Sequence, residues 1–340
     1  MSKVIDIAEV MKVLPPAMPG IVTARQLEQA ALKPPPQVVE GVLHVQSKMI
    51  LSGTSKSNKT WSLLNLAVSV ASGTEWLGRR CTKLPVLYIN FELHDWAIAQ
   101  RLASIYAARP EVLVDGHLGD TLHLWNLRGY NADITELRPK LEEVLDRYQF
   151  GLIIIDPIYK LLGNRDENAN GEIAGLLNEL EALGRRTRAA IVIAHHFAKG
   201  DSTAKNPIDR MSGAGVWARD ADSLVVMTQH EEDDCFTVNM TVRNLPRMED
   251  FVVRWDYPLM RVAKDLNPDA LRRPQARNKV CTDHEFMEAY VGPTPVGRKV
   301  IVEMAAEAGI SARTVDRFLA RLVECDLICS SGGLYWRKQS

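Results

Sequence analysis

The segment GTSKSNKT, residues 53–60, has the residue types of a phosphate-binding loop (P-loop). In the pattern GxxxxGK[ST], backbone N–H groups surround the phosphates, the lysine reaches the β and γ phosphates, and the hydroxyl holds Mg²⁺. The segment matches every fixed position except the second glycine, where Asn58 stands. It therefore predicts a site for ATP and Mg²⁺. The predicted binding residues are Gly53, Thr54, Ser55, Lys56, Ser57, Asn58, Lys59 and Thr60, with Thr60 also a metal ligand.

Asn58 occupies a position where the loop bends tightly and a Cβ crowds the phosphate. Asparagine tolerates a positive φ better than most other non-glycine residues, so we expect the backbone turn to form. Whether Asn58 slows ATP hydrolysis is left open by the sequence. Lys56 either adds charge inside the loop or is simply solvated. Trp61, directly after Thr60, is expected on the first helical turn, packed toward the nucleotide or a neighbouring side chain.

Two carboxylates stand at the ends of apolar runs. Asp156 closes GLIIIDP, and a carboxylate at such a strand tip can support the Mg²⁺ shell through water. Glu92 closes LPVLYINFE, which we expect to form the strand next to the P-loop strand, and a glutamate there can orient and deprotonate the attacking water. The alternatives are a helix-capping Asp156 and a surface Glu92. Beside the P-loop segment, the catalytic interpretation is favoured for both.

Further polar candidates follow later strands. His195 and His196 end the run IVIAHH, where polar side chains of a parallel sheet face the ligand crevice. One of them is expected to sense the γ-phosphate and the other only to pack; a metal pair is disfavoured because adjacent strand residues point to opposite faces. Arg219 and Arg243 lie beside predicted strand ends. Either is a candidate to stabilise the transition state of a neighbouring subunit, and a solvated arginine is the alternative.

Apolar runs and amphipathic segments alternate from Lys48 onward, which predicts an α/β fold with a mostly parallel sheet covered by helices on both sides. The expected strands are 48–53, 84–92, 121–127, 151–157 and 189–196, and the expected helices are 59–73, 95–109, 135–148 and 171–187. After Asp220, short β-prone runs predict antiparallel strands added to this sheet.

The predicted organisation has four parts. Residues 1–45 form a lead-in segment whose three consecutive prolines favour an extended arm, and residues 46–266 form the ATPase domain. Residues 267–280 form a basic linker, and residues 281–340 form a small separate domain.

The small domain is predicted to be a winged helix-turn-helix, with a turn at Gly309, a second helix and a Gly-Gly hairpin. Ser311 is a suitable N-cap for the second helix, in which four apolar residues fall on one face. These are Val315, Phe318, Leu319 and Leu322. The alternative is a helical domain that only packs against the core. Contact with DNA stays open, because winged helices also bind proteins.

Composition excludes several classes of protein. The chain has 340 residues and a formal charge of −1, so it does not coat nucleic acid by charge alone. Its scattered cysteines contain no CxxC pair, so neither a disulfide framework nor a zinc site is indicated. The absence of a long apolar run, with Asp6 and Glu9 near the N-terminus, predicts a cytoplasmic protein without a membrane segment.

Taken in order, the P-loop, YINFE, LIIIDPIYKLLGNRDENANGEIAGLLNELEAL and AIVIAHHFAKG resemble the RecA-like ATPases, most closely the group around the hexameric plasmid helicase RepA. The stretch RMSGAGVWARDADSLVVM is similar to the family's turn before an arginine and the next strand. The resemblance covers roughly residues 38–260 and implies ATP hydrolysis at subunit interfaces of a homo-oligomeric ring that acts on DNA. The alternatives are a nucleotide-gated DNA-binding regulator with slow or no hydrolysis and a protein-remodelling or defence ATPase.

Overall fold

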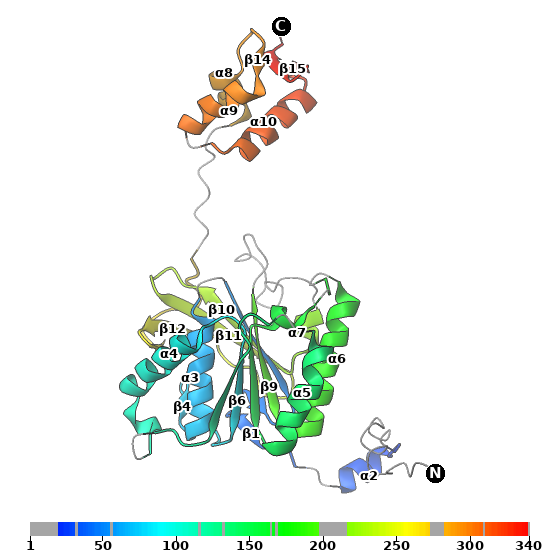
Figure 1. Ribbon diagram of the computed structural model, residues 1–340, viewed down its shortest axis with the longest axis vertical. Helices are drawn as coiled ribbons and strands as arrows, with labels where there is room; N and C mark the ends of the chain where they lie inside the picture. Colours follow the sequence, from blue (N-terminus) through cyan, green and yellow to red (C-terminus); the bar gives the residue numbers. More distant parts are fainter. Residues whose placement is uncertain are drawn as a thin grey trace, which may run out of the picture. The chain divides into compact units, whose positions relative to one another are not determined.

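The computed structural model describes residues 20–30, 33–54, 57–114, 117–130, 133–163, 165–166, 169–196, 216–272, 282–308 and 310–338. The chain divides into two compact units, Met1–Ala270 and Leu271–Ser340 (Figure 1). Each unit has its own hydrophobic core, and each is described by itself.

The first unit is built on a nine-stranded sheet in the order β13-β12-β11-β10-β3-β9-β8-β6-β7. The strands are β3 (Lys48–Gly53), β6 (Val86–Asn90), β7 (Leu122–Asn126), β8 (Leu152–Asp156), β9 (Ala190–His196), β10 (Ser223–Gln229), β11 (Cys235–Val242), β12 (Phe251–Asp256) and β13 (Leu259–Ala263). Neighbouring strands from β10 to β7 run parallel, and β10 to β13 are joined antiparallel. The predicted parallel sheet with added antiparallel strands is confirmed.

The strand order corrects one expectation. Strand β6, which leads into Glu92, is not the neighbour of the P-loop strand β3, because β9 and β8 lie between them. Sequence order suggested adjacency, since β6 is the next long strand after β3. Only the crossover connections of the folded sheet place β8 and β9 between the two.

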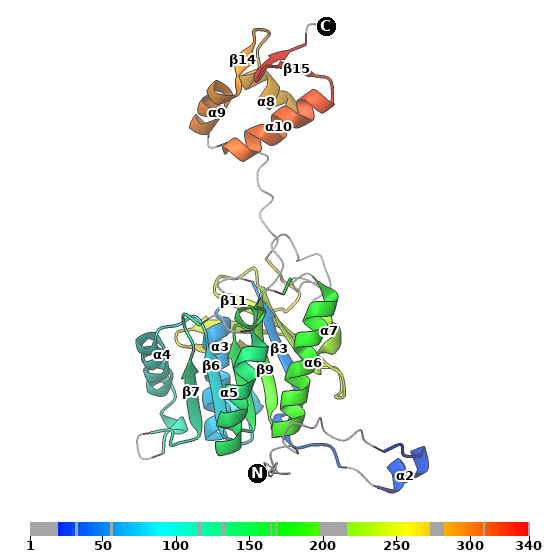
Figure 2. The same ribbon diagram turned by 45° about the vertical axis from the view of Figure 1, so that its right-hand side comes forward.

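Helices cover both faces of this sheet (Figures 1 and 2). Helices α3 (Lys59–Ser72) and α4 (Asp95–Ala108) contribute to one buried apolar cluster. Helices α5 (Ile134–Arg147), α6 (Asn170–Thr187) and α7 (Val216–Asp220) contribute to the other. The central strands β3, β6 and β8 are apolar in nearly continuous runs because both of their faces are buried.

Part of the predicted lead-in belongs to this core. After the prolines, β1 (Gln37–Val39) and β2 (Leu43–His44) form a small antiparallel sheet instead of an extended arm. Val38, Val39, Val42 and Leu43 are fully buried on the α3 face. The prolines end just before β1, and burial of the apolar side chains that follow them stabilises the two strands. A second small sheet joins β4 (Glu75–Trp76) to β5 (Arg79–Arg80).

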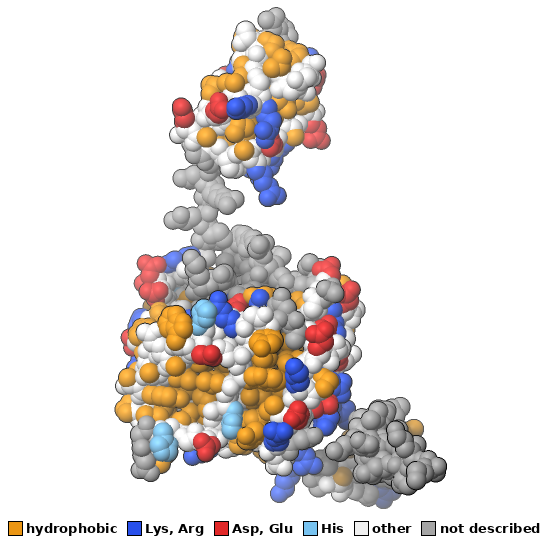
Figure 3. Space-filling view, in the orientation of Figure 1, with side chains coloured by type: hydrophobic (Ala, Val, Ile, Leu, Met, Phe, Trp, Pro, Cys, Tyr) orange, Lys and Arg blue, Asp and Glu red, His pale blue; other side chains and the backbone are white. Residues whose placement is uncertain are grey.

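The remaining elements of the first unit are short. Helix α2 (Ala24–Gln29) has a capping box between Thr23 and Gln26 and buries none of its residues. The 3₁₀ helices are η1 (Pro110–Val112) and η2 (Ile158–Leu161), and η2 follows directly from β8. Strand β7 is an edge of the large sheet. On the face drawn in Figure 3, hydrophobic side chains gather over part of the first unit.

The second unit contains α8 (Asp283–Tyr290), α9 (Arg298–Glu307), α10 (Ala312–Glu324), and a three-stranded sheet of β14 (Val296–Gly297), β15 (Ile328–Ser331) and β16 (Leu334–Arg337). Ser311 caps α10 by accepting a hydrogen bond from the backbone N–H of Thr314, as predicted. The four predicted apolar residues of α10 are buried, and Phe318 stacks on Phe286 with ring centroids 4.5 Å apart. The predicted turn at Gly309 lies outside the described residues.

Among the described residues, no helix has both the length and the apolar character needed to cross a membrane.

Candidate functional site

The P-loop joins the end of β3 to the start of α3. Asn58 adopts φ 54° and ψ 29°, in the left-handed region, so the position does require the backbone conformation for which glycine is usually chosen. Gly53 is needed for space. A Cβ there would lie 2.7 Å from Oγ of Ser57 and 3.0 Å from the carbonyl oxygen of Met227. Ser55 and Lys56 lie outside the described residues.

Lys59 is the first residue of α3 and only 7% exposed. Its Nζ donates hydrogen bonds to the carbonyl oxygens of Gly53, at 3.0 Å, and Thr54, at 2.8 Å. Burial lowers the pKa of Lys59 to about 8, while the negative charges of Asp156 and Glu92 act in the opposite direction. Lys59 is therefore mostly charged at pH 7, with both carboxylates in electrostatic range.

Asp156 ends β8 and is 4% exposed. Burial raises the pKa of its carboxyl, and hydrogen bonds from Tyr88 and Thr60 oppose that rise. The hydroxyl of Tyr88, a fully buried residue of β6, donates to Oδ2 of Asp156 at 2.6 Å. The carboxylate is thus held from two sides, by the P-loop threonine and by a tyrosine of the neighbouring strand.

Glu92 lies just beyond the end of β6 and is exposed. The side chain of Asn90 accepts hydrogen bonds from the backbone N–H groups of Glu92, at 3.3 Å, and Leu93, at 3.0 Å, which fixes the turn. Oε1 of Glu92 accepts a hydrogen bond from the hydroxyl of Tyr159 at 2.6 Å. Burial, followed by this hydrogen bond, raises the pKa of Tyr159 to about 12.

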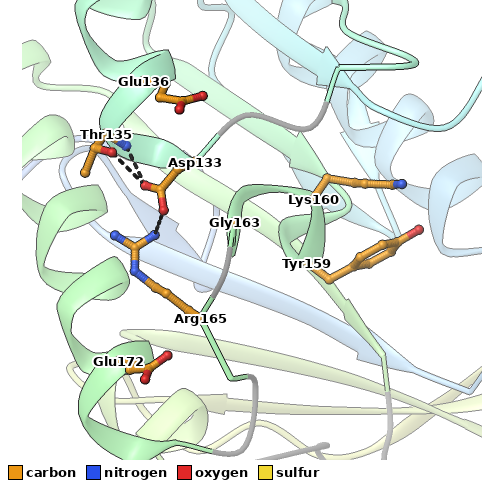
Figure 4. A pocket seen from close by; sticks show the side chains of 8 residues that line it. All are labelled: Asp133, Thr135, Glu136, Tyr159, Lys160, Gly163, Arg165 and Glu172. Carbon is orange, nitrogen blue, oxygen red and sulfur yellow. Dashed lines mark hydrogen bonds and ion pairs between the residues drawn. The ribbon is translucent and has the colours of Figure 1, made fainter.

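Tyr159 also borders a polar cavity of about 800 Å³ (Figure 4). The cavity lies between the start of α5, η2 and the start of α6. It is lined by Asp133, Thr135, Glu136, Tyr159, Lys160, Gly163, Arg165 and Glu172. Arg165 donates to Asp133 at 2.8 Å across it, so its walls are tied together by an ion pair.

Trp61 packs against other aromatic side chains of its own chain. Its ring centroid lies 5.5 Å from that of Trp255 and 5.4 Å from that of Tyr257, in the β12–β13 hairpin. The guanidinium carbon of Arg101 lies 4.7 Å from the Trp61 ring centroid, a cation–π contact. An aromatic surface therefore stands one residue beyond Thr60.

The structure does not bring His195 to the phosphate side. His195 is 2% exposed, and its ring centroid lies 4.5 Å from that of Trp217 in α7, on the sheet face opposite α3. Alternation along β9 explains this, because Ile191 and Ile193 point to the same face. His196 ends β9 beside Gly53, in register with the P-loop strand, but its side chain is outside the described residues.

Arg219 and Arg243 lie at the opposite end of the parallel strands, where β3 and β10 begin. Arg243 donates to the carbonyl oxygen of Arg219 and approaches Oδ1 of Asp222 at 4.0 Å. Asp222 in turn accepts a hydrogen bond from the backbone N–H of Lys48, the first residue of β3. The P-loop lies at the other end of β3, after its last residue. The two ends of β3 are about 16 Å apart at roughly 3.3 Å per strand residue. Within one chain, neither arginine reaches Lys59; action across a subunit interface stays a prediction.

The same end of β3 is tied to the helices beside it. Nζ of the buried Lys48 donates to Glu181 at 3.1 Å and to Asp220, which ties β3 to α6 and α7. This network holds α7 against the sheet and gives the segment a structural role.

The family model described as AAA domain matches residues 14–202, more than half of the chain. The chain belongs to this family of P-loop ATPases. The match includes the whole P-loop, Glu92, Asp156 and the end of β9. No curated protein matches the chain. As a member of this family, the protein is a nucleotide-binding P-loop ATPase, and the residues that the fold gathers around Lys59 are consistent with ATP and Mg²⁺.

Sequence analysis missed three polar members of this site, Tyr88, Asn90 and Tyr159. Tyr88 and Asn90 lie in the run YINFE, and their alternation with apolar residues was the available signal. Tyr159 follows Asp156 by three residues, but nothing in the sequence indicated that it would contact Glu92.

Proposed function

We propose that the protein is an ATP-hydrolysing, RecA-like ring ATPase that acts on DNA, a helicase-like enzyme of a plasmid, phage or other mobile element. The observation that supports hydrolysis most directly is the grouping of Glu92, Lys59 and Asp156, whose charges influence one another. A phosphate-binding cation, a buried carboxylate and an exposed carboxylate are the groups that phosphoryl transfer to water requires.

Each of these residues has a distinct role. Lys59 and the backbone N–H groups of the loop bind the phosphates, and Glu92 orients water and accepts its proton. The hydrogen-bonded oxygens of Thr60 and Asp156 fit Mg²⁺, which prefers oxygen ligands, with Asp156 acting through water. When bound, the metal neutralises phosphate charge. The aromatic surface formed by the half-buried Trp61 and the exposed Tyr257 suits the nucleotide base.

A homo-oligomer is supported by helix α2. A six-residue helix that buries nothing gains no stability from packing, and isolated short helices are marginal in water. Ile21, Val22 and Leu27 expose apolar side chains around it. We propose that they pack on a neighbouring subunit. Mass photometry with ATP should show a ring that the double variant Ile21→Ser/Leu27→Ser fails to form.

We propose that the second unit is a winged helix that contacts DNA. The order of its helices and strands supports the fold, and the exposed side of α10 carries Arg313 and Arg317, one helical turn apart. Arg313→Glu/Arg317→Glu should weaken duplex binding and lower its salt dependence. Lys264→Glu, an exposed change in the first unit, is the control. Unchanged DNA affinity in the double variant would favour a protein partner.

The central experiment measures ATP turnover with and without single-stranded DNA. The intact protein should hydrolyse ATP faster with DNA. Lys59→Ala should be inactive, Glu92→Gln should retain only a small, measurable residual rate, and the exposed control Glu249→Gln should be fully active. The second candidate is a nucleotide-gated DNA-binding regulator. Its supporting observation is Asn58 in place of the loop glycine, and DNA-independent turnover near background would favour it.

A further inference from the structure

We propose that Tyr159 is a positioning residue for hydrolysis, whose hydroxyl holds the carboxylate of Glu92 beside the phosphate site. This inference rests on the proposed function, in which Glu92 is the general base. The contact is direct: the Tyr159 hydroxyl donates to Oε1 of Glu92 at 2.6 Å, although the residues are 67 positions apart. No other side-chain hydrogen bond to Glu92 is seen among the described residues.

Glu92 needs such a partner because little else restrains its side chain. It is exposed, it lies two residues beyond the end of β6, and a glutamate has several rotatable bonds. The Tyr159 hydrogen bond uses Oε1 and leaves Oε2 able to accept a proton from water. In this position the charge of Glu92 acts on Lys59 and Asp156, so the held carboxylate lies within electrostatic range of both residues.

The position of Tyr159 is set by β8, the strand that ends at Asp156. Tyr159 lies on η2, which begins two residues after Asp156, so the short connection places its backbone close to the end of β8. Its ring is 39% exposed on the rim of the polar cavity, and Nζ of Lys160 lies 5.2 Å from the ring centroid (Figure 4). With a pKa of about 12, the hydroxyl stays a donor at neutral pH.

These surroundings make Tyr159→Phe a clean substitution, since it removes one oxygen from a partly exposed ring and opens no core cavity. A misplaced base slows the chemical step without weakening ground-state binding. We expect kcat to fall roughly 10-fold to 100-fold, while KM and the Kd for ATP change less than about twofold. Tyr148→Phe, which alters a residue 49% exposed just after α5, should leave all three parameters unchanged.

The experiment is a double-mutant cycle of Tyr159→Phe and Glu92→Gln, with kcat, KM and the Kd for ATP measured for each variant. If Tyr159 acts through Glu92, adding Tyr159→Phe to Glu92→Gln costs no further activity. Unchanged Kd for ATP shows that the variant site is folded.

Three results would overturn the proposal. Full activity of Tyr159→Phe alongside a strongly slowed Glu92→Gln would remove the role of Tyr159 and leave the proposed function intact. Parallel losses in kcat and ATP affinity would show that Tyr159 only supports the structure. An active Glu92→Gln would exclude Glu92 as the base, and the proposed mechanism would fail together with this inference.

Discussion

Nζ of Lys59 lies 3.0 Å from the carbonyl oxygen of Gly53, so the lysine that we propose to bind phosphate is hydrogen-bonded to the first residue of its own loop. Its charge is buried, and its pKa is lowered to about 8. Phosphates of ATP stabilise the ammonium form, so binding should raise this pKa.

ATP binding should therefore take up a proton at alkaline pH. Near pH 7, Lys59 is already charged, and uptake is small; near pH 9 it approaches roughly one proton per ATP. The Kd should weaken about fivefold between pH 8 and 9, because the uncharged lysine must first be protonated. Calorimetry in buffers of different ionisation enthalpy measures this uptake. Lys59→Met should abolish it, and uptake that persists in that variant would assign it to another group.

Asn58→Gly should leave ATP affinity and turnover near their original values, because asparagine already adopts the left-handed turn. Asn58→Val should reduce ATP affinity strongly, because a β-branched residue at positive φ costs about 1–2 kcal/mol or shifts the loop. Equilibrium binding of a fluorescent ATP analogue compares the three proteins. A rise in turnover for Asn58→Gly would show instead that the asparagine side chain slows hydrolysis.

Gly53→Ala should abolish ATP binding, since the added methyl group meets backbone as well as the Ser57 side chain. The matched change is Gly175→Ala, on the exposed side of α6, where a Cβ meets nothing within 4 Å. It should raise the free energy of unfolding by about 0.5–1 kcal/mol through helix propensity. Denaturant melts and ATP titrations separate the effects. Normal ATP binding by Gly53→Ala would mean that the loop accommodates the added methyl group without a loss of ATP affinity.

Tyr88→Phe should shift the acidic limb of the kcat/KM profile to higher pH. The Tyr88 hydroxyl stabilises the ionised form of Asp156, so its removal should raise a pKa that burial has already raised. As pH falls, Asp156 would then lose its charge earlier. Tyr106→Phe, on the same face of the sheet, is the control. Superimposable profiles for Tyr88→Phe and the intact protein would contradict this role for Tyr88.

The sequence determined the elements of the site and the chemistry of their ends. The P-loop pattern, the apolar runs before Glu92 and Asp156, and the left-handed tolerance of Asn58 are local properties, readable from residue types and spacing. The burial pattern of α10 followed from its 3.6-residue period in the same way.

Only the tertiary structure decided which strand ends meet. The strand order placed β9 and β8 between β3 and β6. The packing of α7 on the sheet placed Trp217 against His195, and the direction of the strands put Arg219 and Arg243 at the strand ends away from the P-loop. The contacts of Tyr88 with Asp156 and of Tyr159 with Glu92 also join residues distant in sequence. Such pairings depend on the crossover connections and on the face of the sheet to which each side chain points. Local residue patterns do not determine the contacts between residues distant in sequence.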